Sequence, residues 1–234
     1  MASDVGCVRA HNEDRCLVVE KAQVYAVADG MGGQAAGEVA SSMLVEVLQS
    51  DLSLGGLTEE DLSKSVLHAN EKILASAAAH PKYQGMGTTA TVLHIKSGQA
   101  LWAHVGDSRL YLYRHGSLQQ VTEDHSYVES LVREGKLTEE EARSHPQKNM
   151  LLRAVGVEKG LEVDKGSFPL HEGDILLLAT DGLMNMVSDQ EIEKQLFCAS
   201  EASPEGGSPA KELVRQALAA GGFDNVTVIV VVYG

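Results

Sequence analysis

Residues 175–182, ILLLATDG, indicate a buried β-strand that ends in a carboxylate. Residues 226–233, VTVIVVVY, share this almost continuous apolar character, which is typical of strands buried on both faces of a sheet. Both segments belong to a set of short runs rich in Val, Leu, Ile, Tyr or Thr and bounded by Gly or charged residues. We predict strands at 15–20, 23–28, 88–95, 99–105, 109–114, 117–121, 163–168, 174–180 and 225–233.

Helical patterns precede and follow these strands. Apolar residues recur about every fourth position in 35–49 and 58–79, and the second segment opens with Thr58 and Asp61 at capping-box spacing. The same spacing predicts further helices that begin near 138 and 188. Ser208, Pro209 and Gly221 are typical cap, first-turn and stop residues, and they predict a last helix near 209–220. We expect the Gly- and Ser-rich segment 199–209 to join two helices of one domain.

The order of these elements favours one fold class. Two long helices come early as a pair, a run of adjacent strands follows, and further helices come late. Strict alternation of strand and helix is absent, so a doubly wound parallel sheet is disfavoured. We expect a single α+β domain over 1–234, with antiparallel sheets flanked by helix pairs.

The composition is that of an ordinary soluble globular protein, with 44% hydrophobic and 22% charged residues in 234. The formal net charge of -14 argues against nucleic acid or an anionic membrane as the main partner. Cys7, Cys16 and Cys198 form no regular framework, which fits a reducing compartment. No signal-peptide or membrane-spanning pattern is present, so we expect a cytoplasmic location. The first motif lies close to Met1, so the chain is also compatible with a domain of a longer protein.

Four aspartates occupy the same kind of position, at the end of an expected strand. Asp29 and Asp181 end strands and precede glycines, Asp107 follows Gly106, and Asp224 comes just before the last strand. Carboxylates that converge with backbone carbonyls and waters suit hard cations such as Mg²⁺ or Mn²⁺. Asp-Gly is also a common hairpin turn, so each of these positions has an ordinary structural explanation. Both interpretations stay open on the residues alone.

Two neighbouring features also have competing explanations. The glycines of DGMGG at 29–33 lack the spacing of a dinucleotide-binding loop, so we disfavour a nucleotide site. Arg9 lies close to Glu13 and Asp14, which is typical of a surface ion pair. Alternatively, the guanidinium binds a phosphate while the two acids hold metal-bound waters.

The order of the motifs resembles that of the protein phosphatase 2C-like (PPM) family, in its bacterial branch. The motifs are RxxNED (9–14), DGMGG (29–33), GTT (87–89), VGDSR (105–109), DHS (124–126), TDGL (180–183) and GxxDNVT (221–227). Each is weak alone, but together they follow the family's order from about residue 3 to 233.

This resemblance implies a four-layer α-β-β-α sandwich with metals at one end. It implies that Asp29, the Gly30 carbonyl, Asp181 and Asp224 hold two core Mn²⁺ or Mg²⁺ ions, with Asp29 bridging them. Asp107, with Asp181, matches a weaker third metal position. Arg9 matches the phosphate-binding arginine, and Glu13 and Asp14 match residues that hold the waters around the metals. The insert at about 127–155 matches a flap beside the active site.

The implied activity is that of a metal-dependent serine/threonine phosphoprotein phosphatase. A hydroxide bridging the metals would attack phosphorus in line without a covalent intermediate. We expect a monomer that acts on phosphoserine and phosphothreonine proteins, including a cognate bacterial kinase. Cys7 is not surrounded by a CxxxxxR phosphate loop, so a cysteine-dependent phosphatase is disfavoured.

The proton donor and the substrate class remain open. Met31 and Gln34 stand where some family members carry histidine, which leaves His11, His125, His145 or a metal-bound water as the general acid. The alternative functions are a non-catalytic module that binds phosphoproteins or a kinase, and a hydrolase of small phosphorylated metabolites.

Overall fold

The computed structural model describes residues 1–32, 36–53, 56–201 and 207–234. Two five-stranded sheets form its centre, and every strand pairing is antiparallel. One sheet has the order β1 (Ala2–Asp4), β12 (Val226–Val232), β11 (Ile175–Ala179), β8 (Arg109–Arg114) and β9 (Ser117–Gln120). The other has the order β10 (Asp164–Pro169), β7 (Gln99–Val105), β6 (Ala90–Lys96), β3 (Val24–Ala28) and β2 (Arg15–Val19). We refer to them as the β12 sheet and the β3 sheet.

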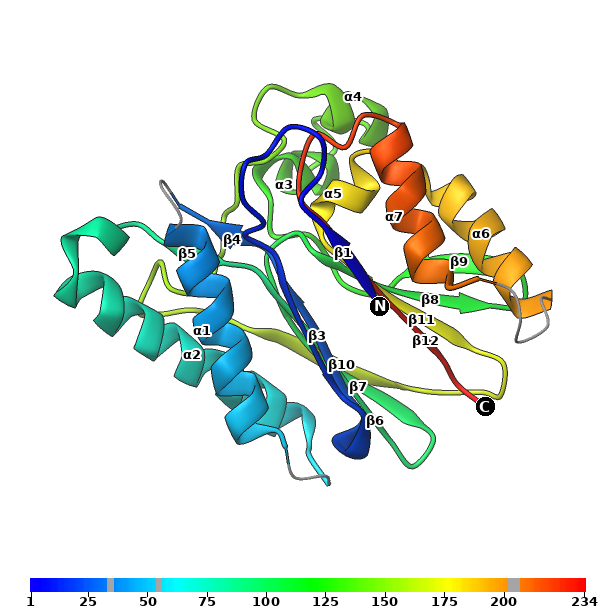
Figure 1. The fold of residues 1–234 in the computed structure, drawn as a ribbon, viewed down its shortest axis with the longest axis horizontal. Coiled ribbons are helices and arrows are strands. Elements are labelled where there is room, and N and C mark those ends of the chain that lie inside the picture. The colour runs from blue at the N-terminus through cyan, green and yellow to red at the C-terminus, as the bar shows by residue number, and fades with distance from the viewer. Residues whose placement is uncertain (33–35, 54–55, 202–206) are drawn as a thin grey trace.

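A helix pair covers the outer face of each sheet (Figure 1). Helices α1 (Ala36–Asp51) and α2 (Glu59–Ala79) pack on the β3 sheet, and their Leu44 and Ile73 join its buried Val92 in one cluster. Helices α6 (Asp189–Glu201) and α7 (Pro209–Ala219) pack on the β12 sheet. The layers therefore follow the order helix, sheet, sheet, helix, as the resemblance implies.

The segment that opens the sequence analysis shows why the two sheets stay together. Along β11, Leu177 points to the helix side, whereas Leu176 and Leu178 point between the two sheets. There they meet Leu93 of β6 and Ile229 of β12. Because successive residues of a strand face opposite sides of the sheet, an unbroken apolar run lets β11 pack against the helices on one face and against the other sheet on the opposite face.

Shorter elements lie around one end of this sandwich. The two-residue strands β4 (Gly30–Met31) and β5 (Gly87–Thr88) pair with each other, and α5 (Asp181–Met184) directly follows β11. The insert contains α3 (Tyr127–Arg133) and α4 (Glu139–Ser144). Bridges from Ser126 to Leu151 and from Thr88 to Val155 fix its two ends. Two 3-10 turns, η1 (Glu20–Ala22) and η2 (Pro81–Tyr83), complete the described elements.

Most expected boundaries agree with the structure to within a few residues. The capping boxes at Thr58 and Thr138 are present, and Ser188 makes the same exchange with Glu191 ahead of α6. Ser208 occupies the N-cap of α7 as expected, although its side chain makes no capping hydrogen bond. Residues 202–206 of the expected connection lie outside the described residues, and so do Gly33 and Gln34 of the glycine-rich segment.

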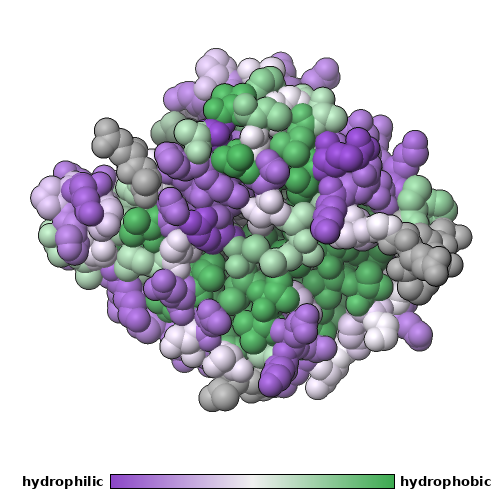
Figure 2. All heavy atoms as spheres, in the orientation of Figure 1, coloured by the Kyte–Doolittle hydropathy of each residue, from purple (hydrophilic) through white to green (hydrophobic). Residues whose placement is uncertain are grey.

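The face turned to the viewer in Figure 1 carries apolar atoms in its middle, near the chain ends, with hydrophilic atoms around them (Figure 2). Within the part of the chain that the structure describes, no helix is long and apolar enough to cross a membrane.

Candidate active site

The strand topology brings the four aspartates to one end of the sandwich. β3 and β7 both pair antiparallel with β6, so they run in the same direction, and Asp29 and Asp107 follow their matching ends. β11 and β12 are antiparallel, so Asp181, after β11, lies beside Asp224, before β12. The four carboxylates line one pocket of about 210 Å³ together with Arg9, Glu13 and Gly30. The β3 sheet supplies two of the four aspartates, and the β12 sheet supplies the other two.

The pocket crowds negative charge into a buried place. Burial raises the pKa of Asp29 well above its ordinary value, and the charges of Asp14, Asp181, Asp107 and Asp224 raise it further. Burial likewise raises the pKa of Asp107, with Asp181 as the next cause. For Asp181, burial and the charge of Asp224 raise the pKa. Carboxylates held together against their own repulsion are typical of a site that binds cations.

Unpaired oxygens in this region test whether the residues fit a divalent ion. Among the described residues, Asp181 Oδ1 and Asp14 Oδ1 are buried and have no hydrogen-bond partner. A buried carboxylate oxygen without a donor is unfavourable unless a cation or a water satisfies it. The donor set of carboxylates plus a backbone carbonyl also suits Mg²⁺ or Mn²⁺. Within the described ranges, no three His, Cys, Asp or Glu side chains are already arranged as a group that could hold a metal ion, so the fit rests on the unpaired oxygens and on the chemistry of the donor set.

Glycines let the backbone close tightly around the pocket. A Cβ on Gly30 would lie 2.2 Å from the Gly37 oxygen, and one on Gly182 would lie 1.9 Å from the Asn225 oxygen. Real Cβ atoms essentially never come so close. The glycines that follow Asp29 and Asp181 therefore serve close packing of the loops, beyond any turn preference.

Arg9 lies at the pocket on a loop near the N-terminus. Its Nη2 donates a hydrogen bond to Asp224 Oδ2 at 2.7 Å, and this bond is the largest cause of the raised pKa of Arg9. The Arg9 side chain is 52% exposed, and its bond to Asp224 uses one of the three guanidinium nitrogens. Glu13 also lines the pocket, and burial raises its pKa.

Asp14 is not among the lining residues. Thr180, the residue before Asp181, donates its hydroxyl to Asp14 Oδ2 at 2.7 Å. Burial raises the pKa of Asp14 to about 7, against the lowering effect of that hydrogen bond. Asp14 thus acts on the pocket through Thr180 and through its charge, one layer behind the lining carboxylates.

Several site residues were not singled out from the sequence. Thr89 accepts a hydrogen bond from the Asp29 amide at 2.8 Å and bonds the Ser108 hydroxyl at 2.7 Å, which links the loops after β3 and β7. Asn225 accepts from the Glu13 amide at 2.8 Å. Asn149, from the insert, reaches the pocket as well. Their place in or beside the GTT, GDS and DNV motifs is the signal that points to Thr89, Ser108 and Asn225.

The three candidate histidines are not among the residues that line this pocket. His125 is buried, accepts from the Gly106 amide at 3.1 Å, and has its other nitrogen 3.2 Å from Asp164 Oδ2. Its Nδ1 accepts a hydrogen bond and so carries no proton, and burial lowers the pKa of the side chain, so His125 is neutral and holds the loop ahead of Asp107. His145 accepts from the Gln147 amide within the insert.

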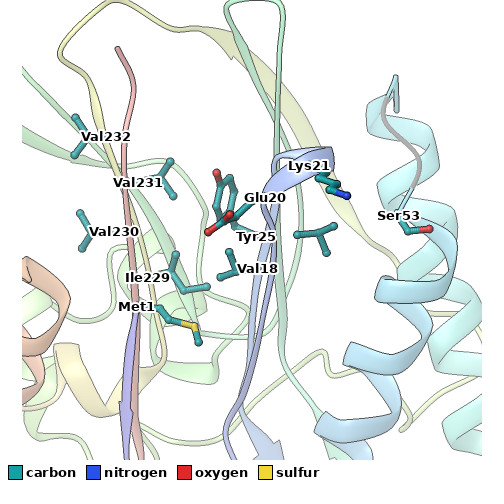
Figure 3. Close-up of a pocket in the computed structure, with 11 residues that line it drawn as sticks. Met1, Val18, Glu20, Lys21, Tyr25, Ser53, Ile229, Val230, Val231 and Val232 are labelled. Atoms are coloured by element: carbon teal, nitrogen blue, oxygen red, sulfur yellow. The ribbon is translucent and has the colours of Figure 1, made fainter.

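Two further cavities help to delimit the site. The first, about 920 Å³, lies between the sheet edges and is lined mainly by apolar residues such as Val18, Tyr25 and Ile229 (Figure 3). It lacks the convergent carboxylates of the smaller pocket, so its size does not make it the reactive centre. A cavity of about 530 Å³ lies under α3 and α4 and shares Asp107 and Asp181 with the carboxylate pocket. Space for a substrate therefore continues from the carboxylates toward the insert.

Comparisons with known proteins agree with this fold. A family model described as protein phosphatase 2C matches residues 8–219. The serine/threonine phosphatase stp of Listeria innocua serovar 6a is 41% identical over 238 residues, which is 98% of this chain and 93% of that protein. The crystal structure of the Mycobacterium tuberculosis serine/threonine phosphatase PstP/Ppp matches with a TM-score of 0.88 and 41% identity, covering 98% of this chain and 95% of that one.

A third match bears on metals. The catalytic domain of the serine threonine protein phosphatase PstP, in complex with two manganese ions, matches with a TM-score of 0.87 and 39% identity. That match covers 98% of this chain and 94% of the other. The sandwich expected from the sequence is confirmed by these structures.

Proposed function

The chain belongs to the protein phosphatase 2C family and is a protein-serine/threonine phosphatase, and from this premise we propose that it hydrolyses phosphoserine and phosphothreonine with divalent metal ions held in the carboxylate pocket. The observation that carries the proposal is the convergence of Asp29, Asp107, Asp181 and Asp224 with Arg9 on one small pocket. Such a set combines metal ligands with a phosphate-binding cation.

We assign the metal ligands by residue. Asp29, the Gly30 carbonyl, Asp181 and Asp224 would hold two core ions, Mn²⁺ or Mg²⁺, and Asp107 with Asp181 would hold a weaker third. The two manganese ions in the related catalytic domain support the number of core ions. Bound ions of this kind supply Lewis acidity that generates a hydroxide nucleophile near neutral pH, for in-line attack without a covalent intermediate.

Arg9 would bind the phosphoryl oxygens of the substrate. Its side chain is half exposed, lines the pocket and bonds Asp224 through one guanidinium nitrogen. A planar guanidinium binds two oxygens of a phosphate at once, which fixes the orientation of the phosphorus atom. Charge that develops on the phosphoryl group would be stabilised by this fixed donor.

Glu13 and Asp14 would orient the waters around the ions. Glu13 lines the pocket, and Asp14 has one buried oxygen without a partner. Thr89 and Asn225 hold the loops of Asp29 and Glu13, so we assign them a positioning role. The buried, neutral His125 makes a poor proton donor, which favours water as the general acid over this histidine.

The insert at 127–155 would act as a flap within the single domain 1–234. Its Lys148 Nζ lies 3.3 Å from Asn185 Oδ1, and Asn185 donates to Asp181 Oδ2 at 2.9 Å, so this segment communicates with the carboxylates. We further propose a monomeric, cytoplasmic enzyme that opposes a bacterial serine/threonine kinase. The similar proteins from Listeria and Mycobacterium support the bacterial context.

The test is hydrolysis of a phosphothreonine peptide with and without Mn²⁺. We expect turnover that a chelator abolishes and Mn²⁺ restores, and a loss of about a hundredfold to a thousandfold in Asp29→Asn. Asp51→Asn, an exposed aspartate on α1, is the matched control. The absence of any turnover with Mn²⁺ would exclude the proposed chemistry, and full activity of Asp29→Asn would exclude the metal assignment. Faster hydrolysis of small phosphorylated metabolites than of peptides would favour the metabolite alternative.

A further inference from the structure

Large exposed apolar residues are concentrated beside the carboxylate pocket. Val8 and Phe223 are 63% and 61% exposed, and they directly adjoin Arg9 and Asp224 in the sequence. Exposed apolar side chains next to a charged site are a common mark of a binding surface. Phosphate binding by Arg9 and metal binding by Asp224 do not explain why Val8 and Phe223 are apolar and exposed.

The backbone places Val8 and Phe223 on the same side of the pocket. The loops that carry them run side by side, tied by a hydrogen bond from the Cys7 amide to the Gly222 oxygen at 2.7 Å (Figure 1). The bond between Arg9 and Asp224 joins the same two loops. The Phe223 ring lies close to Gly221, because a Cβ on that glycine would be 2.9 Å from the ring. The ring is therefore held in place against backbone and leaves much of its surface to solvent.

Apolar residues from two other segments line the carboxylate pocket itself. Met31 and Leu151 are half buried and both line the pocket, and Leu151 is fixed by its bridge to Ser126. Val157, 53% exposed, lies near Met31, since a Cβ on Gly87 would be within 3 Å of both side chains. The pocket thus has apolar lining groups on the segments that follow β3 and β9, and Val8 and Phe223 stand beside it on the two loops that carry Arg9 and Asp224.

We propose that Val8 and Phe223, with Met31 and Leu151, select phosphoprotein segments that carry a bulky apolar side chain within two residues of the phosphoserine or phosphothreonine. This specificity rests on the function proposed above. An extended peptide advances about 3.3 Å per residue, so a side chain one or two positions from the phosphorylated residue reaches the residues that adjoin Arg9 and Asp224. We refer to the four residues as the apolar rim.

Charge supports an apolar flank over an acidic one. Among the described lining residues, Arg9 is the single cation, and it already pairs with Asp224 and serves the phosphate. No other cationic side chain among the described residues that line this pocket is left to pair with an Asp or Glu flank. Peptides with Asp or Glu at the flanking positions should therefore gain no rate over peptides with Gly there.

The test compares phosphothreonine peptides that differ only at the two positions on each side of the phosphorylated residue. Leu or Phe there should give a kcat/KM about tenfold above Gly, or about 1.4 kcal/mol, and Asp should give no gain over Gly. In Phe223→Ser and Val8→Ser the ratio of the Leu peptide to the Gly peptide should fall toward one. Phe197→Ser changes an exposed phenylalanine on α6, 51% exposed, and should keep the wild-type ratio.

The ratio within each variant is the readout, so a general loss of activity in a poorly folded variant does not produce the expected result. Equal rates of the wild-type protein on Leu and Gly peptides would overturn the apolar rim while leaving the phosphatase function standing. A ratio that persists in both Phe223→Ser and Val8→Ser would also overturn it. A wild-type protein that hydrolyses no peptide would refute the proposed function, and this specificity with it.

Discussion

Asn225→Ala should unfold the protein more easily because one buried amide holds the N-terminal loop against the rest of the site. Asn225 is 5% exposed. It accepts a hydrogen bond from the Glu13 amide at 2.8 Å and donates to the Val5 and His11 oxygens at 2.9 and 3.0 Å. At a net value of about 1 kcal/mol each, the three bonds contribute about 3 kcal/mol to the free energy of unfolding.

This loss is large enough to measure by two methods. For a protein of this size it corresponds to a fall in Tm of roughly 6–12 °C. Urea unfolding at neutral pH gives the free energy, and a thermal melt gives the Tm. Gln119→Ala, an exposed amide on β9, is the control and should stay within about 0.5 kcal/mol of wild type. A loss below about 1 kcal/mol in Asn225→Ala would refute the reasoning, because the loop would then be held by other contacts.

Three further predictions concern close packing, pH and metal binding. Gly182→Ala should destabilise the protein and lower kcat, because the new Cβ would lie 1.9 Å from the Asn225 oxygen. Gly160→Ala is the control, because a Cβ there would have no neighbouring atom within 4 Å. Equal urea midpoints for the two variants would contradict the expectation. Burial lowers the pKa of His104 from 6.5 to about 3. Below pH 6.5 the His104 side chain therefore stays neutral in the folded protein but takes up a proton in the unfolded chain. The free energy of unfolding should fall as the pH drops from 6.5 toward 3, by up to about 1.4 kcal/mol per pH unit from this group. His104→Gln should flatten that slope in urea unfolding series, and an unchanged slope would argue against the assignment. Mn²⁺ should raise the Tm of the wild type, and a chelator should reverse the effect, because a bound cation neutralises carboxylates whose charged form burial and mutual repulsion disfavour. The Tm of the Asp29→Asn variant should rise less with Mn²⁺. An equal rise in the two proteins would place the ions elsewhere.

The strands that the sequence predicts best are those with long aliphatic runs. Residues 174–180 and 225–233 were expected as strands, and β11 and β12 occupy Ile175–Ala179 and Val226–Val232. β1, β4 and β5 were not expected, since two or three residues carry no periodicity and form strands only because a partner is already in place. The same holds for α5, a single turn after β11.

Part of the candidate site could be predicted from the sequence for a related reason. A carboxylate after a buried strand is visible in sequence, and the antiparallel topology then brings four such ends together. Contacts between distant segments could not be predicted from the sequence. Nothing in the local sequence pairs Arg9 with Asp224, 215 positions away, or assigns the Asn225 amide to the Val5 and His11 carbonyls. His125 was weighed as a proton donor, and only its burial and its bond to the Gly106 amide indicate a structural role.

Drawing half of the carboxylates from each sheet has a consequence for the newly made chain. Asp29 is translated early, whereas Asp224 and the strand that supports it come about 195 positions later. At typical bacterial and eukaryotic elongation rates of about 5–20 residues per second, roughly 10–40 s separate the two. A nascent chain on the ribosome therefore holds most of the helices and strands of the molecule before it holds a complete reaction centre. Under the proposed metal assignment, we expect a product that terminates before the last strand to lack phosphatase activity.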